Sequence, residues 1–251
     1  MELDGGWTAF ARRYIEMQDR GDPARTLLLD PVMLRLSGDV AGKRVLDLGC
    51  GEGRFCRMLA ARGAATVGLD LIREMVATAR QRSPSGQAYV QASAEKLPFR
   101  DATFDLFVSY ITLVDIPDYR AAIAEAARCL RPGGYFLVAN LSFVTAIPDS
   151  LEYKQITGWV RDEVGNRLYR AVDAYIVERP LVFEWNGMKI RNWHRPLSGY
   201  MTAFLQSGLV LRDFLEPAPT DDSLRDDPRF EDWYRVPEFL VMRWQKPGGQ
   251  N

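Results

Sequence analysis

The stretch VLDLGCGEGRF, residues 45–55, joins a short apolar run to three closely spaced glycines. The apolar run has the character of a buried strand, and the amphipathic sequence that follows it is typical of a helix. A turn needs one glycine, whereas three within residues 49–53 let a ligand approach backbone N–H groups closely. We therefore expect a ligand-binding loop directly after a buried strand.

Apolar runs alternate with amphipathic segments around this loop. The pattern predicts strands over residues 44–49, 66–70, 87–92, 103–110 and 135–140, and helices over residues 53–63, 71–83 and 119–134. Such alternation is typical of parallel βαβ units, with helices covering both faces of the sheet. The sequence thus predicts an α/β, doubly wound fold.

The rest of the chain is interpreted as part of one domain, residues 1–251. Residues 1–40 form a helical cap in this interpretation, with helices over 8–17 and 22–38. Residues 141–196 are irregular and aromatic-rich, with a predicted hairpin over 174–193 that turns at Asn186-Gly187. We expect this insertion to form a lid over a substrate, the alternative being a second small core. A helix over 197–208 and strands over 209–217 and 238–247 would complete the sheet, and acidic residues 217–233 would form a surface loop.

Composition restricts the class of partner. The chain has 251 residues and a net charge of −1, so no basic field is available for nucleic acid or an anionic membrane. No apolar run approaches the roughly 18 residues of a membrane span. The three cysteines fit neither a disulfide framework nor a zinc site, and the single histidine excludes a multi-histidine metal site. We expect a soluble cytoplasmic protein with no metal; its oligomeric state is not readable.

The glycine loop does not suit a dinucleotide. The G-x-G-x-x-G fingerprint would end in a glycine at position 54, which is Arg54 here. Two acids, Asp47 and Glu52, would also lie beside a pyrophosphate. They suit a cationic ligand such as S-adenosylmethionine. Asp70 ends the second strand about 20 residues further on, where a carboxylate can accept ribose hydroxyls or cap a helix.

Four stretches together carry a family resemblance. VLDLGCGEGRF, TVGLD, SAEKLPFRDATFDLFVSY and LRPGGYFLVAN resemble the small-molecule branch of the class I S-adenosylmethionine-dependent methyltransferases. The resemblance covers about residues 40–140. It implies a Rossmann-like sheet of seven strands with the last one antiparallel. It also implies S-adenosyl-L-methionine as cofactor and S-adenosyl-L-homocysteine as product.

The resemblance and the loop together define a set of candidate cofactor residues. Asp47, Gly49 and Gly51 would follow the methionine part, Asp70 the ribose, and Leu71, Ser93 and Ala94 the adenine. Cys50 and Glu95 are included as their neighbours, although the thiols of Cys50 and Cys56 are interpreted as packing. Relatives often carry Asp at the position of Ser93, so we expect weaker adenine recognition. Tyr110 would position the transferred methyl, and Tyr14 would either close over the cofactor or simply pack in its helix.

The acceptor is predicted to be a small molecule, aromatic or heteroaromatic, methylated at O or N. His194 is a candidate general base, the alternative being a histidine that fixes the turn before Pro196. Other candidate substrate-binding residues are Tyr14, Asn140, Ser142 and Trp193. Asp115, a possible metal partner of Asn140, is expected instead at the start of the following helix. Carbon methylation and a cofactor-binding subunit without its own chemistry remain alternatives.

Overall fold

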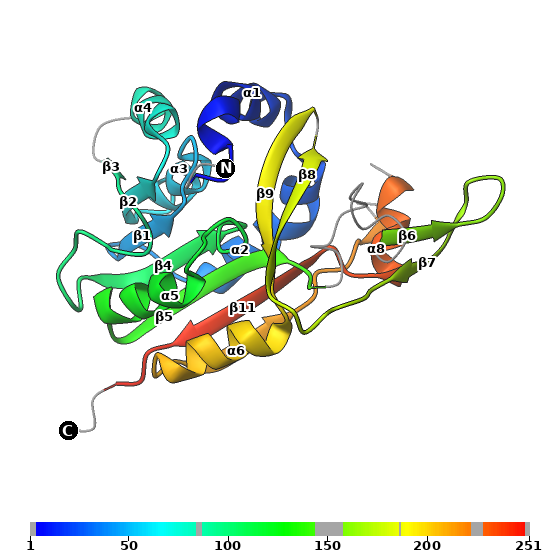
Figure 1. The fold of residues 1–251 in the computed structure, drawn as a ribbon. Helices are drawn as coiled ribbons and strands as arrows, with labels where there is room; N and C mark the ends of the chain where they lie inside the picture. Colours follow the sequence, from blue (N-terminus) through cyan, green and yellow to red (C-terminus); the bar gives the residue numbers. More distant parts are fainter. Residues whose placement is uncertain (1–3, 84–86, 144–157, 186, 222–227, 249–251) are drawn as a thin grey trace.

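A single sheet of seven strands organises the computed structural model, which describes residues 4–83, 87–143, 158–185, 187–221 and 228–248 (Figure 1). Its strands, in the spatial order β10-β11-β5-β4-β1-β2-β3, are β10 (Val210–Leu215), β11 (Phe239–Gln245), β5 (Leu130–Leu141), β4 (Phe104–Tyr110), β1 (Arg44–Leu48), β2 (Ala65–Asp70) and β3 (Ala88–Gln91). β11 runs antiparallel to both of its neighbours, β10 and β5, and the other pairings in the sheet are parallel. The predicted α/β sheet with an antiparallel last strand is thereby confirmed.

Alternating side chains divide the core between the two faces of the sheet. In β5, Phe136 and Val138 join one apolar cluster, whereas Leu137 and Ala139 join the other. This two-residue period is what a strand buried on both faces requires. The first cluster is covered by α5 (Tyr119–Cys129) and α6 (Leu197–Gln206). The second is covered by η1 (Ala24–Leu29), α2 (Asp30–Ser37) and α3 (Arg54–Ala60).

Two further helices and two hairpins complete the described parts of the chain. Helix α1 (Trp7–Arg20) contacts α4 (Arg73–Arg82), which packs on β2 and β3. The hairpins are β6 (Gly158–Arg161) with β7 (Arg167–Ala171), and β8 (Arg179–Trp185) with β9 (Met188–His194). The β8–β9 hairpin lies next to the start of α1, where the Arg191 N–H donates to the Gly5 carbonyl at 3.0 Å (Figure 1). It corresponds to the predicted hairpin, although Asn186 of its turn lies outside the described residues.

Three element boundaries differ from the sequence prediction. Helix α5 ends at Cys129, and β5 begins at once with Leu130, because backbone bonds between Gly133, Gly134 and Lys246 extend the sheet pairing. The helix predicted over 22–38 is divided into η1 and α2, which begins at Asp30 with a proline in its first turn. The predicted surface loop contains η2 (Pro228–Glu231) and the start of α8 (Asp232–Arg235).

Candidate active site

A large cavity lies beyond the carboxyl ends of β1, β2, β4 and β5. Its volume is about 770 Å³, within the range of pockets that enclose a drug-sized ligand. The lining combines the glycine loop with the segments that follow β2, β3 and β4, and adds residues of α1, β9 and α8. In doubly wound sheets, ligands bind at this edge, where the strand order reverses between β1 and β4.

The three glycines of the loop differ in the space around them. A Cβ on Gly49 would lie 2.1 Å from the Thr112 Cγ2 atom, and one on Gly53 would lie 2.7 Å from the Tyr89 hydroxyl. Glycine at these two positions therefore lets the loop pack closely on the segment that follows β4 and on β3. At Gly51 the nearest atom to such a Cβ is Tyr14 Cε1, 3.9 Å away. Gly51, which has a positive φ of 55°, is thus the glycine of this loop that leaves open space toward the cavity.

Asp70 holds the loop in place. Its Oδ2 accepts a hydrogen bond from the Gly51 N–H at 2.8 Å, and its Oδ1 accepts one from the Ile72 N–H at 2.9 Å. Burial raises the pKa of Asp70, although these N–H groups oppose the shift. Each carboxylate oxygen keeps a second lone pair that can accept a bond from a ligand in the cavity.

Asp47 lies beneath the loop with one oxygen unused. Its Oδ2 accepts a bond from the Cys56 thiol at 3.4 Å, whereas its buried Oδ1 has no partner among the described residues. Burial raises the pKa of Asp47 to about 7; Asp70 and Glu52 add to the shift, and Cys56 and Arg25 oppose it. A buried carboxylate oxygen without a partner is costly, so this site favours a cationic ligand.

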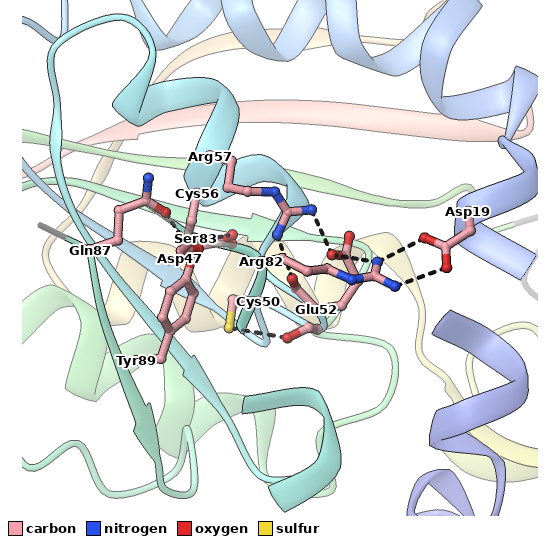
Figure 2. A network of polar contacts seen from close by, with 11 residues as sticks. Asp19, Asp47, Cys50, Glu52, Cys56, Arg57, Arg82, Ser83, Gln87 and Tyr89 are labelled. Carbon is pink, nitrogen blue, oxygen red and sulfur yellow. Dashed lines mark hydrogen bonds and ion pairs between the residues drawn. The ribbon is translucent and has the colours of Figure 1, made fainter. Parts of the chain in front are cut away.

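A polar network joins the loop to α1. Glu52, which is 4% exposed at its side chain, bonds Arg57 Nη2 at 2.6 Å and Arg82 Nη1 at 3.2 Å. The Arg82 guanidinium also forms a two-pronged pair with Asp19 of α1, with both distances at 2.8 Å. Figure 2 shows Arg82 lying between Glu52 and Asp19. The loop, α4 and α1 are therefore tied together through one arginine.

Two tyrosines line the cavity together with a buried charge cluster. The Tyr110 hydroxyl donates to Asp30 Oδ1 at 2.8 Å, and Arg54 pairs with the same carboxylate. Arg25 donates to the Tyr14 hydroxyl at 2.8 Å and pairs with Asp22 at 3.2 Å. Both tyrosine hydroxyls therefore already have protein partners, which fixes the orientation of their rings.

The predicted adenine-side residues reach the same cavity. Leu71, Ser93, Ala94 and Glu95 all line it, and Leu71 is 45% exposed. The Ser93 hydroxyl accepts a bond from the Glu95 N–H at 3.2 Å. Glu95 in turn accepts a bond from the Asp118 N–H at 2.8 Å, so the carboxylate of Glu95 also supports the start of α5.

The candidate acceptor residues are placed differently. The lining includes Tyr14 but not Asn140, Ser142, Trp193 or His194. His194 is fully buried, and its Nε2 donates to the Tyr175 carbonyl at 2.7 Å. Burial lowers the pKa of His194. This geometry matches the alternative in which the histidine is a structural residue, and gives the base hypothesis no support.

Sequence reasoning missed several lining residues. The structure adds Arg25, Asp115, Asn192, Trp233 and Glu238. Asp115 was expected at the start of α5, and this prediction is wrong. Asp118 is the N-cap of that helix, and Asp115 lies in the preceding turn. All five come from segments whose sequence pattern does not indicate the cavity.

Known proteins share both the sequence and the shape of this chain. Residues 46–138 match the methyltransferase domain family model. A crystal structure of an S-adenosylmethionine-dependent methyltransferase from Mesorhizobium loti is 29% identical, with a TM-score of 0.77 over 90% of this chain and 98% of that one. The chain belongs to the class I S-adenosylmethionine-dependent methyltransferases. Its cofactor is therefore S-adenosylmethionine.

Curated relatives of this methyltransferase are similar over a shorter part. An O-methyltransferase from Penicillium expansum is 34% identical over 150 residues, which are 55% of this chain and 54% of the relative. A fatty-acid O-methyltransferase from Mycolicibacterium smegmatis is 42% identical over 105 residues, or 41% of this chain and 38% of the relative. The methyltransferase thus spans about half or less of the length of these relatives.

The cavity of the methyltransferase fits this cofactor. S-Adenosylmethionine carries a sulfonium and an ammonium group, and the unpartnered Asp47 oxygen is a buried acceptor suited to a cation. The open side of Gly51 and the free lone pairs of Asp70 suit a ligand with ribose hydroxyls.

Within the described residues, no group of His, Cys, Asp and Glu could hold a metal ion. No helix among them is long and apolar enough to cross a membrane.

Proposed function

We propose that this protein transfers the methyl group of S-adenosylmethionine to nitrogen or oxygen of a small, flat molecule. One observation carries the proposal: the cavity that contains the glycine loop is also lined by the apolar side chains of Leu141, Trp233 and Phe239, here called its apolar end. A cofactor at the loop and an acceptor at the apolar end would occupy the same cavity, which suits an in-line displacement.

The cofactor is assigned to the predicted residues. Asp70 would accept the ribose hydroxyls, Leu71, Ser93, Ala94 and Glu95 would surround the adenine, and Asp47, Gly49 and Gly51 would hold the methionine part, with Cys50 beside them. Bound S-adenosylmethionine supplies an electrophilic methyl on a positively charged sulfur. The chain's own residues bind it, orient it and exclude water from the reacting atoms.

The apolar end would select the acceptor. Trp233 stacks on Phe230 with ring centroids 4.3 Å apart and meets Phe239 edge to face at 5.9 Å. Rings held in this way offer a rigid surface for a planar molecule. The names of the curated relatives describe oxygen acceptors. The matched family model, however, ends at residue 138, before β9, α8 and β11 contribute to the cavity.

Calorimetric titration with S-adenosylhomocysteine, beside NAD as a control, tests the cofactor half of the proposal. We expect micromolar binding of S-adenosylhomocysteine alone. Methyl-labelled S-adenosylmethionine, incubated with the protein and a panel of aromatic alcohols and amines, tests the transfer. Cofactor binding without transfer to any of them would favour the alternative of a cofactor-binding subunit, and label on carbon would favour a C-methyltransferase.

A further inference from the structure

We propose that the methyl acceptor is an amine whose nitrogen is held between the side chains of Asp115 and Asn192. This inference rests on the proposed function and narrows it from oxygen or nitrogen to nitrogen. Both side chains line the cavity, and each presents a buried oxygen that has no hydrogen-bond partner among the described residues.

Asp115 is positioned by the cofactor loop. Its backbone N–H donates to the Thr112 carbonyl at 2.9 Å, closing a turn directly after β4. The Thr112 hydroxyl donates to the Gly49 carbonyl at 3.2 Å. Asp115 therefore lies on the segment that follows β4, in a turn whose first residue, Thr112, is hydrogen-bonded to the loop assigned to the cofactor.

Asn192 reaches the same place from β9. It is 6% exposed, and its Oδ1 is buried without a partner. The next residue, Trp193, donates its backbone N–H to the carbonyl of Val114 at 2.7 Å. Because Val114 precedes Asp115 and Trp193 follows Asn192, this bond places the two residues on adjacent segments of the chain beside the cavity. The Arg191 N–H bond to Gly5 fixes the other side of Asn192.

Two acceptor oxygens select the chemistry of the group between them. A primary ammonium brings three N–H donors and can satisfy both oxygens at once, whereas a hydroxyl brings one and a carboxylate brings none. A group that left either oxygen without a donor would keep its desolvation penalty, of about 1–3 kcal/mol. The pair therefore favours an amine over an alcohol or an acid.

The charge of the lining supports the same choice. Carboxylate side chains far outnumber basic ones in the cavity, whose arginines, Arg25 and Arg54, are already paired with Asp22 and Asp30. An anionic acceptor would find an acidic cavity whose cations are already neutralised. A protonated amine would be drawn in.

Asp115 can also take the proton that blocks reaction. Burial raises the pKa of Asp115 to about 7 and Asp70 adds to the shift, whereas Trp7, Arg195 and Arg191 oppose it. The ammonium gives one proton to the Asp115 carboxylate, which frees its lone pair. That pair forms the N–C bond to the methyl while the C–S bond breaks, and its electrons stay on sulfur. The products are a methylated ammonium and neutral S-adenosylhomocysteine.

The test uses compounds that differ only in the acceptor group. Phenethylamine, phenethyl alcohol and phenylacetic acid form one such set, and tryptamine, tryptophol and indoleacetic acid form another. The full chain is incubated with each compound and methyl-labelled S-adenosylmethionine. We expect label on the amines alone. Label on the alcohols or acids, or on none of the amines although S-adenosylhomocysteine binds, would overturn the amine assignment. Failure to bind S-adenosylhomocysteine would overturn the proposed function itself.

Variants then test the two side chains. Asp115→Asn should lower kcat/KM for the accepted amine by about tenfold or more and remove the ionisation near pH 7 from its pH profile. Asn192→Leu should raise KM for the amine, with S-adenosylhomocysteine affinity kept in both variants. Asp101→Asn, an exposed carboxylate outside the cavity lining, is the matched control. Rates within twofold of the unsubstituted protein for both cavity variants would refute the role of the pair.

Discussion

The Asp70 carboxylate accepts a hydrogen bond from the Gly51 N–H at 2.8 Å, so the residue assigned to the ribose also holds the glycine loop. This double role separates two substitutions. Asp70→Asn keeps one acceptor oxygen, whereas Asp70→Ala removes both and leaves the Gly51 and Ile72 N–H groups without their partners.

We expect Asp70→Ala to weaken S-adenosylhomocysteine binding by about 1–3 kcal/mol, the scale of bonds to a charged group. Asp70→Asn should weaken it less. Calorimetric titration measures both, and urea unfolding shows how much of the effect is loss of the loop. Cofactor affinity unchanged in the alanine variant would remove Asp70 from the site.

Asp47 should make cofactor binding depend on pH. Its pKa in the folded protein is raised to about 7, so Asp47 is protonated below pH 7 when no cofactor is bound. The folded protein therefore loses stability as the pH rises through the pKa of Asp47. A cation beside Asp47 favours the ionised form. S-Adenosylhomocysteine affinity should therefore rise between about pH 6 and 8, by at most tenfold per pH unit for one proton.

Asp47→Asn should flatten this pH profile. Asp115, the other cavity carboxyl whose pKa is raised to about 7, is the natural control, because its substitution should leave the cofactor profile in place. If Asp115→Asn abolished the pH dependence of S-adenosylhomocysteine affinity and Asp47→Asn did not, Asp115 would be the carboxylate beside the cofactor's cation.

His194 should behave as a structural residue. It is fully buried and bonded to the Tyr175 carbonyl, outside the cavity lining. His194→Ala should lower the free energy of unfolding in urea by about 1–3 kcal/mol, since it removes this bond and leaves a gap. S-Adenosylhomocysteine affinity should not change. Full stability combined with a hundredfold loss of methyl transfer would restore the histidine as the base.

Gly49 should tolerate a side chain poorly. Gly49→Ala places a methyl 2.1 Å from Thr112 Cγ2 at a φ of 70°. Gly133→Ala is the matched control, because its φ is 80° and nothing lies within 4 Å of the added atom. Both variants bear the left-handed backbone cost of about 1–2 kcal/mol. The Gly49 variant should lose about 1–3 kcal/mol more in urea unfolding, through overpacking. Equal losses would show that the loop can move away from Thr112.

The sequence predicted those elements of the fold and site that have a local sequence pattern. Apolar strands, amphipathic helices and the G-x-G-x-G loop each have their own spacing, so the sheet and the placement of Asp47, Gly51 and Asp70 on the cavity could be expected. Asp115 and Asn192 could not. Their proximity depends on one backbone bond between Val114 and Trp193, which joins segments almost 80 residues apart, and no spacing records it. The aromatic character of the insertion was a weak guide for the same reason: Trp159 and Trp193 do not line the cavity, whereas Trp233 from the supposed surface loop does.

Arg82 should influence cofactor binding without touching the cofactor. It joins Asp19 of α1 to Glu52 of the loop, and Tyr14 of α1 lines the cavity. Arg82→Met should free α1 from the loop and weaken S-adenosylhomocysteine binding by about threefold to tenfold, since about 1 kcal/mol is a typical net hydrogen-bond contribution. Arg128→Met is a close control: both arginine side chains are 31% exposed and both bond two carboxylates, but Arg128 bonds Glu125 and Asp101 away from the lining. Calorimetric titration should separate the two variants. Equal affinities would mean that α1 stays in place over the cavity without this connection.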